Sequence, residues 1–489
     1  MTEVLLVAML ASPVIGAGLL ALPLSARASR RLNAVLAVAV AAASGAVAVV
    51  ELTQIGEPLR GSWYAIDPAG AVFLLVIAAV GLMSALASPA YLTGDASGFF
   101  AGRRARSAYY AALYLFWAAL LALAAVDNLA VAWLLVEATT AASALLVAFS
   151  GRAQALEAGW KYLVLTTLGL AIALLGIIVL YAGIAEDGAS IAALDWARVH
   201  AAAAGIDYTT AVAAVVLLLG GLAAKVGWAP VHNWLPDAHS EAPPPVSALL
   251  SAALLPTVML IAWRVEAALR PATGGAGSGL LLGFGLLSLA VAIPFLWRAL
   301  PLKRLLAYSS LEHMGILALG IGFVHPIATA GVVLHVAGHA LAKSLGFYAT
   351  ISLLRADPRL ARRAPRGLVA TSRGAAGAVT VSLGSLSGLP PSPLFFSEVL
   401  ILLGGLAAGE TAVVVVAAVM LGLGFLGLAH ALIEGVVTDA PSRRRPAVPG
   451  ERRLKLLTAV VAGGLLGLSA TVWALPGSRL IAELMGVLG

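Results

Sequence analysis

Ionisable side chains lie in the middle of long apolar stretches of this sequence, where charge is costly. Glu137 lies within VAWLLVEATTAAS, Lys225 ends LLLGGLAAK, and Glu398 follows GLPPSPLFFS. A charged group at the centre of a membrane helix costs about 2.5–3.5 kcal/mol on insertion scales, so such groups normally face a bundle interior, a partner or water. Acids and bases in these places are suited to taking up and releasing protons, and we expect them to be functional.

Glu137 and Lys225 form the first expected pair. Thr139, Thr140 and Ser143 follow Glu137 closely and could solvate its carboxylate. Burial favours a neutral lysine, whereas an opposed carboxylate favours the ammonium form, so a lysine here can change its protonation state. The alternatives are a structural ion pair for Glu137 and, for Lys225, a side chain that extends to the membrane surface.

A third group of ionisable residues lies on one predicted helix, in LHVAGHALAKSLGF. His335, His339 and Lys343 stand at i, i+4 and i+8 and therefore share a face. Two histidines at i, i+4 could also ligate a metal. No Glu stands between them and the chain has no Cys, so we favour a hydrated proton path and expect no metal.

Further candidates flank these groups. Glu312 and His313, in LKRLLAYSSLEHMGI, lie deep enough in a predicted helix to take part in the same path. Lys161, in GWKYLV, is either a relay residue or a side chain that reaches the membrane surface. Lys303 and Arg304 are expected at the interface as orientation anchors.

The composition indicates that these residues are carried by membrane-spanning helices. Of 489 residues, 61% are hydrophobic and 11% are charged, against roughly 25% charged in a soluble domain. A helix needs roughly 20 mostly apolar residues to cross the bilayer. Such stretches predict an all-α integral membrane protein with about fourteen spans: 4–24, 33–50, 70–92, 107–125, 128–149, 160–182, 209–229, 244–263, 277–297, 304–323, 327–354, 374–403, 410–436 and 455–475.

The basic residues alternate between loops in a way that fixes a topology. Arg and Lys gather in the odd-numbered loops, including the tract 441–453, whereas the even-numbered loops are acidic or sparse. Cytoplasmic loops carry the Arg and Lys excess. We therefore expect a multi-pass protein of the inner or plasma membrane with both termini outside. The net charge of +7 is explained by this pattern and by contact with membrane lipids, and no nucleic acid is expected.

Several kinds of chemistry are excluded or discounted. The absence of cysteine rules out thiolate ligation of an iron–sulfur cluster and c-type haem attachment, so we expect no cofactor in this chain and place electron transfer in another polypeptide. The chain has no GxxxxGK[ST] phosphate loop, and the GxGxxG match at 422–427 lies in an apolar helix. His232, Asp237, His239 and Glu241 lie in a Pro-rich connector, where we expect turn residues rather than ligands.

Two apolar segments are interrupted by Gly and Pro at comparable positions, 225–230 and 388–393. Paired interrupted helices indicate an inverted repeat with an ion site at the break. We therefore predict broken helices seven and twelve and four regions: helices one to three (1–106), a first five-helix repeat (107–263), a second inverted repeat (277–436) and a C-terminal helix fourteen (455–489).

The tract KVGWAPVHNWLPDAHSEAPPPVSALL, with LVEATT, WKYL, KRLLAYSSLEHMG, HVAGHALAKSLGF and GLPPSPLFFSE, resembles the antiporter-like membrane subunits. That family includes proton-pumping subunits of respiratory complex I, Mrp cation/proton antiporters and subunits of membrane-bound [NiFe] hydrogenases. The resemblance covers roughly residues 107 to 435 and implies fourteen helices with broken helices seven and twelve. It implies a Glu–Lys pair at Glu137 and Lys225, a central lysine at Lys343 and a terminal acid at Glu398. Glu at 398 is most similar to component F of hydrogenase-4 type complexes.

The expected function is a proton relay within a redox-driven complex of hydrogenase-like or NADH–quinone oxidoreductase-like type, with other membrane and peripheral subunits as partners. One alternative is a sodium/proton antiporter subunit of the Mrp kind, which would use the same residues. A second alternative is a non-conducting scaffold or an anion-uptake partner, which would tolerate loss of the buried charges.

Overall fold

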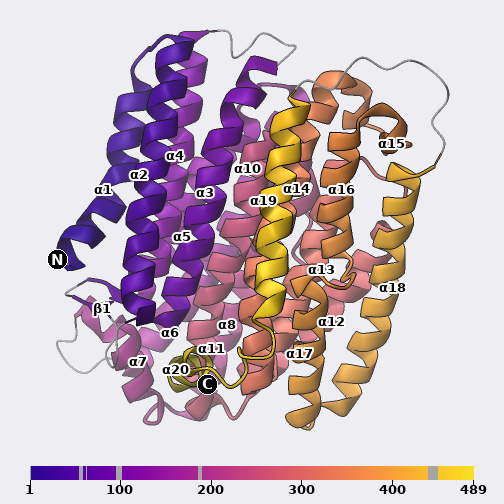
Figure 1. The fold of residues 1–489 in the computed structure, drawn as a ribbon. Helices are drawn as coiled ribbons and strands as arrows, with labels where there is room; N and C mark the ends of the chain where they lie inside the picture. The colour runs from indigo at the N-terminus through magenta and orange to yellow at the C-terminus, as the bar shows by residue number, and fades with distance from the viewer. Residues whose placement is uncertain are drawn as a thin grey trace.

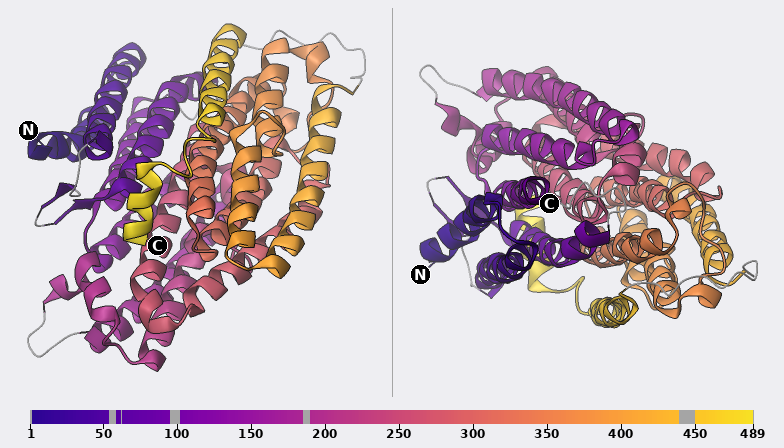
Figure 2. Two further views of the ribbon diagram at one scale, coloured as in Figure 1. Left: turned by 60° about the horizontal axis from the view of Figure 1, so that its bottom comes forward. Right: turned by 90° about the horizontal axis from the view of Figure 1, so that it is seen from above.

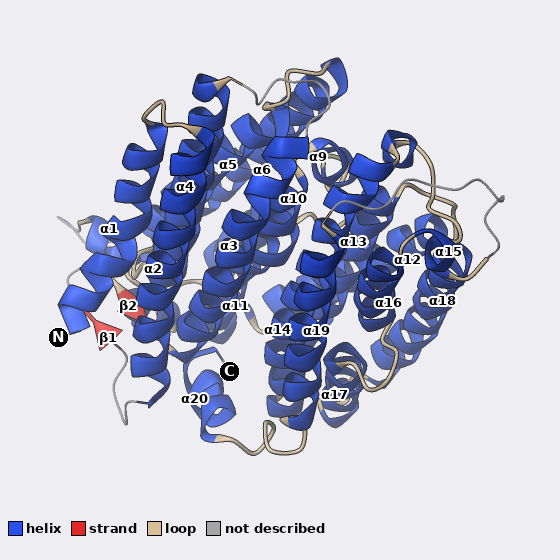
Figure 3. Cartoon of the chain, turned by 45° about the horizontal axis from the view of Figure 1, so that its top comes forward, coloured by secondary structure: helices blue, strands red, loops and turns tan. Residues whose placement is uncertain are grey.

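The computed structural model describes residues 2–53, 59–61, 63–94, 102–184, 190–438 and 450–488. Helices make up almost all of this part of the chain (Figure 1). The described strands are β1 (Leu59–Arg60) and β2 (Ala65–Ile66), an antiparallel pair near the start of the chain (Figure 3). The prediction of an all-α fold is confirmed, and residues 441–449 of the predicted cytoplasmic loop lie outside the described residues.

Thirteen helices in the described residues are long and apolar enough to cross a membrane. One of them, Pro244–Thr273, is built from α10 (Pro244–Leu249), a π-helical turn η3 (Leu250–Leu254) and α11 (Leu255–Thr273). The others are α1 (Thr2–Ala21), α2 (Ala26–Thr53), α3 (Pro68–Gly94), α4 (Arg103–Ala125), α5 (Leu129–Ala148), α6 (Ala153–Ile184), α8 (Tyr208–Val226), α12 (Ala276–Leu296), α13 (Leu302–Gly322), α14 (Pro326–Ala356), α18 (Thr411–Val436) and α19 (Glu451–Ala470).

The remaining helices are short. They are η2 (Ile191–Leu194), α7 (Trp196–Ala203), α9 (Leu235–Glu241), η4 (Pro358–Ala361), α15 (Leu368–Thr371), α16 (Arg373–Leu386), α17 (Pro393–Ala407) and α20 (Arg479–Leu488). The predicted span 374–403 corresponds to two shorter helices, α16 and α17. Neither is long enough alone to cross a membrane, so thirteen single helices are found where fourteen crossings were expected.

The break in the twelfth crossing follows from local sequence. Gly388 has φ +74°, a left-handed conformation that side chains rarely adopt. The Ser392 side chain caps α17 by accepting a hydrogen bond from the backbone N–H of Leu394. Pro393 occupies the first turn of α17, where a backbone N–H would have no partner within the helix. The predicted break is therefore present, with a new helix start directly after it.

The break in the seventh crossing separates α8 from α9. The helix α8 ends at Gly227, which has φ +82°. Two indole N–H groups satisfy backbone carbonyls near the break: Trp234 donates to Ala224 O at 2.7 Å, and Trp228 donates to Met314 O at 2.7 Å. Backbone groups freed inside a membrane protein need such partners, and the break is thus held in a fixed geometry.

The bundle is elongated, with α1 and α2 at one end and α18 at the other (Figures 1 and 2). The span Pro244–Thr273 and α13 each contain a stretch of 18 residues that is completely buried inside it. Outer helices expose apolar side chains instead: Leu134 of α5 is 59% exposed and Val419 of α18 is 61% exposed. This pattern fits a protein whose surface is covered by lipid or by other membrane subunits.

The helix α20 was not anticipated within the predicted C-terminal region. Its residues Ile481, Leu484 and Leu488 are buried, and Arg270 of α11 donates a hydrogen bond to Leu488 O at 3.3 Å. In Figure 1 α20 lies beside α11, with which it is in contact.

Candidate functional site

Lys225 lies in the last turn of α8 with no exposed surface. Its Nζ donates hydrogen bonds to Thr140 Oγ1 of α5 at 2.7 Å and to Tyr162 Oη of α6, and it stands 4.5 Å from the centre of the Tyr162 ring. The tyrosine hydroxyl also bonds Ser143 Oγ at 2.7 Å. The alternative of a side chain that extends to the membrane surface is therefore wrong, because Lys225 is fully buried and bonded to side chains of α5 and α6.

Glu137 is partly buried on α5 and interacts electrostatically with Lys225. Its hydrogen-bond partner is Thr167 of α6. The expectation that Thr139, Thr140 and Ser143 solvate this carboxylate is wrong, because their hydroxyl groups donate to backbone carbonyls of α5 instead. Thr140 and Ser143 also bond Lys225 and the tyrosine beside it. Ion pairs in the described residues include none between Glu137 and Lys225.

Lys343 of α14 and Glu312 of α13 form the centre of the second half. Lys343 has no exposed surface, and its Nζ donates to Leu306 O at 2.5 Å and to Ser309 Oγ, both on α13. Glu312 is 3% exposed and interacts electrostatically with Lys343. The Oε2 of Glu312 has no hydrogen-bond partner among the described residues, and Oε1 lies against Gly424 of α18, where a Cβ would collide with it. The sequence had given Glu312 only a secondary place.

Three buried histidines continue from this centre. His313 Nδ1 and His335 Nε2 are 3.0 Å apart, and His335 Nδ1 is 2.8 Å from Ser397 Oγ of α17. His339 packs with its ring centre 5.2 Å from that of His313, and both of its nitrogens lack a partner among the described residues. The predicted common face of His335 and His339 is present, and it is turned toward α13.

Glu398 lies on α17, shortly after the second break. A Cβ added to Gly388 would come within 2.9 Å of Glu398 Oε2, so the carboxylate packs over the glycine of the break. One ligand atom each from His313, His335 and Glu398 lies within 4.8 Å of the others. His335 bonds His313 and Ser397 through its two ring nitrogens, and the expectation of no metal stays a prediction.

His239 is a residue that the sequence reasoning set aside. It was expected in a turn, but α9 carries it into the bundle with no exposed surface and with neither ring nitrogen bonded in the described structure. Its ring stands 6.2 Å from Trp234 and 6.0 Å from Phe347 of α14, and Trp234 stands 4.5 Å from Tyr162. A row of rings thus connects the surroundings of Lys225 with α14. Only the lack of a glycine between Leu235 and Glu241 hinted at a helix there.

The remaining candidates lie at the edge of the bundle. Lys161 has a side chain 46% exposed and pairs with Glu157 at 2.6 Å and with Asp237 at 3.5 Å. Arg304 pairs with the same Asp237 at 3.3 Å. Lys303 differs from the expected interface anchor, because it is only 9% exposed and donates to backbone carbonyls at the end of α9.

The fold and the site together define a class: a multi-pass helical membrane protein whose interior holds two lysine-centred clusters of acids, histidines and hydroxyl groups. A family model described as NADH:quinone oxidoreductase/Mrp antiporter, transmembrane, matches residues 126–424. This chain belongs to that family, and the resemblance drawn from its motifs is confirmed.

Individual relatives agree with this assignment. The chain is 32% identical over 350 residues to a hydrogenase-4 component F homolog of Methylacidiphilum infernorum, covering 70% of this chain and 72% of the relative. It is 29% identical over 489 residues to NADH-quinone oxidoreductase subunit N of Desulforudis audaxviator, covering 92% and 91%. A subunit of the membrane-bound sulfane sulfur reductase, an archaeal respiratory membrane complex, has the same fold, with a TM-score of 0.84, 19% identity and 99% and 98% coverage.

Proposed function

We propose that this protein translocates protons as the non-redox membrane subunit of a redox-driven complex. The observation that carries the proposal is the environment of the two buried lysines. Lys225 and Lys343 have no exposed surface and form no ion pair in the described structure; neutral hydroxyl and carbonyl oxygens bind both. An ammonium held in this way has lost its water without gaining a contact carboxylate, so it can change protonation state when a neighbouring charge moves.

The arrangement supports a route through both halves of the bundle. Glu137 modulates the charge of Lys225 in the first half. His239 stands between the two halves and interacts electrostatically with Lys343. Glu312 then links Lys343 with Glu398 of the second break, because it interacts electrostatically with both. Waters between these groups would complete the relay.

The driving reaction belongs to partner subunits in this proposal. The chain contains no cysteine, and its buried groups are acids, amines and imidazoles, which exchange protons rather than electrons. The solved relative lies in a multi-subunit respiratory complex. The partly exposed Glu137, on a helix that also exposes Leu134, is well placed to sense the charge state of a neighbouring subunit.

Proton uptake into sealed vesicles that contain the intact parent complex tests the proposal. Lys225→Ala and Glu398→Gln should each lower uptake per turnover by at least about tenfold, since each removes a group that must bind the proton. Lys455→Ala and Glu483→Gln are matched controls, because these side chains are 54% and 37% exposed on α19 and α20. Uptake should stay at the wild-type level in both controls.

The outcomes separate the alternatives. Normal uptake in both site variants, at matched assembly, would assign the subunit to the scaffold class. Uptake that requires sodium ions on the opposite side, and that continues without the redox substrate, would assign it to the sodium/proton antiporters of the Mrp kind, a class included in the description of its family.

A further inference from the structure

A large cavity lies at the Arg-rich face of the bundle, outside the buried clusters. Its volume is about 700 Å³, and its walls come mainly from the loop between α5 and α6, the end of α9, the facing ends of α12 and α13 with the loop between them, and the end of α14 with the segment after it. These segments surround odd-numbered loops of the predicted topology. The cavity therefore lies between segments from the two halves of the chain.

The walls of the cavity are strongly basic. They hold five cationic side chains and a single carboxylate, that of Glu241: Arg152, Arg298, Lys303, Arg304 and Arg362. A cationic side chain that already has an ion-pair or hydrogen-bond partner within the protein does not need a ligand. The partners of the five side chains therefore show which of them are available to bind one.

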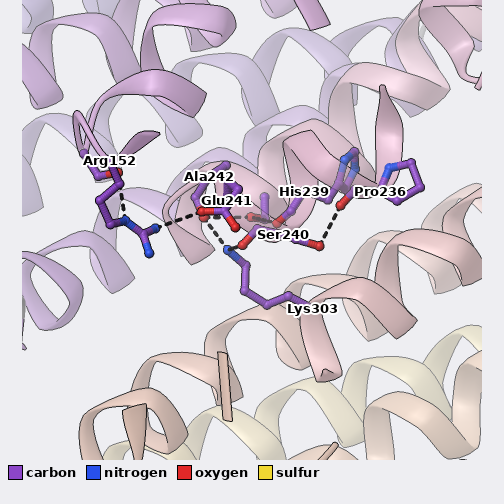
Figure 4. Close-up of polar contacts among 9 residues, drawn as sticks. Arg152, Pro236, His239, Ser240, Glu241, Ala242 and Lys303 are labelled. Atoms are coloured by element: carbon purple, nitrogen blue, oxygen red, sulfur yellow. Dashed lines mark hydrogen bonds and ion pairs between the residues drawn. The ribbon is translucent and has the colours of Figure 1, made fainter. Parts of the chain in front are cut away.

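Three of the five cations are engaged within the protein. Arg152 pairs with Glu241 at 3.2 Å, and Lys303 donates to Ser240 O at 2.7 Å and to Ala242 O (Figure 4). Arg304 pairs with an aspartate of α9. These contacts hold the end of α9 in place on one wall of the cavity.

Arg298 and Arg362 differ from the other three. Both are exposed to the cavity region, and the ion pairs and side-chain hydrogen bonds of the described residues include neither guanidinium. They come from separate segments, the loop after α12 and the segment after α14. Two unpaired guanidinium groups on one basic cavity attract an anion, and their planar donor geometry suits the oxygens of a phosphate.

The apolar part of the wall indicates what carries that anion. Phe295 and Tyr308 stack with ring centres 4.0 Å apart and planes 5° apart, and Leu300, Leu353 and Leu360 complete this side. Tyrosine and other aromatic side chains gather where a bilayer meets water. A ligand with a phosphate head and hydrocarbon chains satisfies both parts of the cavity, whereas a free phosphate satisfies only the basic part.

We propose that this cavity binds the phosphate group of an acidic phospholipid, with Arg298 and Arg362 as its ligands. Basic pockets between membrane helices at the Arg-rich surface are suited to such head groups. A lipid held there would join the segment after α14 to the wall formed by α9, and so would tie the second half of the broken seventh helix to the other half of the protein.

Native mass spectrometry of the purified full chain, titrated with phosphatidylglycerol in detergent, tests the proposal. We expect one phosphatidylglycerol to bind with preference over phosphatidylcholine. The double variant Arg298→Gln/Arg362→Gln should weaken that binding by at least about tenfold, since it removes both charged donors to the phosphate. Arg298→Lys/Arg362→Lys should restore part of the affinity, because it keeps the charge.

The control is Arg103→Gln/Arg104→Gln, which removes two exposed arginines at the start of α4, away from the cavity walls. Its affinity should stay within about twofold of the wild type. Equal binding of phosphatidylcholine, or unchanged binding in the double variant, would overturn the proposal. It would also fail if inorganic phosphate bound through the same arginines while the lipid did not. It would likewise fail if the isolated chain bound the lipid but the parent complex did not, because a neighbouring subunit would then fill the cavity.

Discussion

The hydroxyl of Tyr162 offers a sharp test of how Lys225 works. The Nζ of Lys225 has two hydrogen-bond acceptors among the described residues, Thr140 Oγ1 at 2.7 Å and Tyr162 Oη. Tyr162→Phe removes one of them and keeps the ring, which packs 4.5 Å from Trp234 and 4.5 Å from the ammonium. The change therefore weakens the binding of the ammonium with little loss of packing.

The size of the effect follows from the lost hydrogen bond. A hydrogen bond to a charged group contributes about 1.5–3 kcal/mol, and each 1.36 kcal/mol changes a rate about tenfold. If proton transfer passes through the charged form of Lys225, proton uptake per turnover should fall about ten- to hundredfold in Tyr162→Phe. The Ser143 hydroxyl, which bonds the same tyrosine hydroxyl, can still donate to the Thr139 carbonyl, so it is not left without a hydrogen-bond partner.

The assay is proton uptake into sealed vesicles of the parent complex, with assembly measured in parallel. Tyr208→Phe is the matched control, because Tyr208 is 63% exposed at the start of α8 and removing its hydroxyl should leave uptake unchanged. Wild-type uptake in Tyr162→Phe would refute the reasoning. An equal loss in both variants would also refute it, because the effect would then not arise at the lysine.

Two further predictions concern the second break and the loop after α4. Gly388→Ala should lower proton uptake by at least about tenfold, because a left-handed residue with a Cβ costs about 1–2 kcal/mol and the new Cβ meets the Glu398 carboxylate at 2.9 Å. Gly377→Ala is the control and should leave uptake unchanged, since no atom lies within 4 Å of its added Cβ. Equal losses of uptake in the two variants would contradict the proposal. Burial raises the pKa of Asp127, so the folded protein binds this proton more tightly than the unfolded chain and loses stability as pH rises above about 4. Asp127→Asn should therefore raise the melting temperature relative to wild type at pH 7 and lose that advantage near pH 4, and a gain that does not depend on pH would argue against this cause.

The sequence alone determined the membrane class, the approximate spans and the two breaks. Long apolar stretches are stable only within a bilayer, and the Gly and Pro residues clustered at 225–230 and 388–393 interrupt a helix because proline lacks the N–H that the helix needs. It also singled out Lys225, Lys343 and Glu398, since an ionisable group in an apolar stretch is conspicuous whatever surrounds it.

Only the tertiary structure decided which groups these charges meet. Tyr162 lies 63 positions from Lys225, and its role depends on how α6 and α8 pack, which an almost uniformly apolar helix does not encode in its periodicity. His239 read as part of a polar turn, yet α9 packs inside the bundle, because the partners that bury it come from α6, α13 and α14. Glu312 became central for the same reason: nearly all residues of α13, on all its faces, are buried, so no face could be identified as the inner one from sequence.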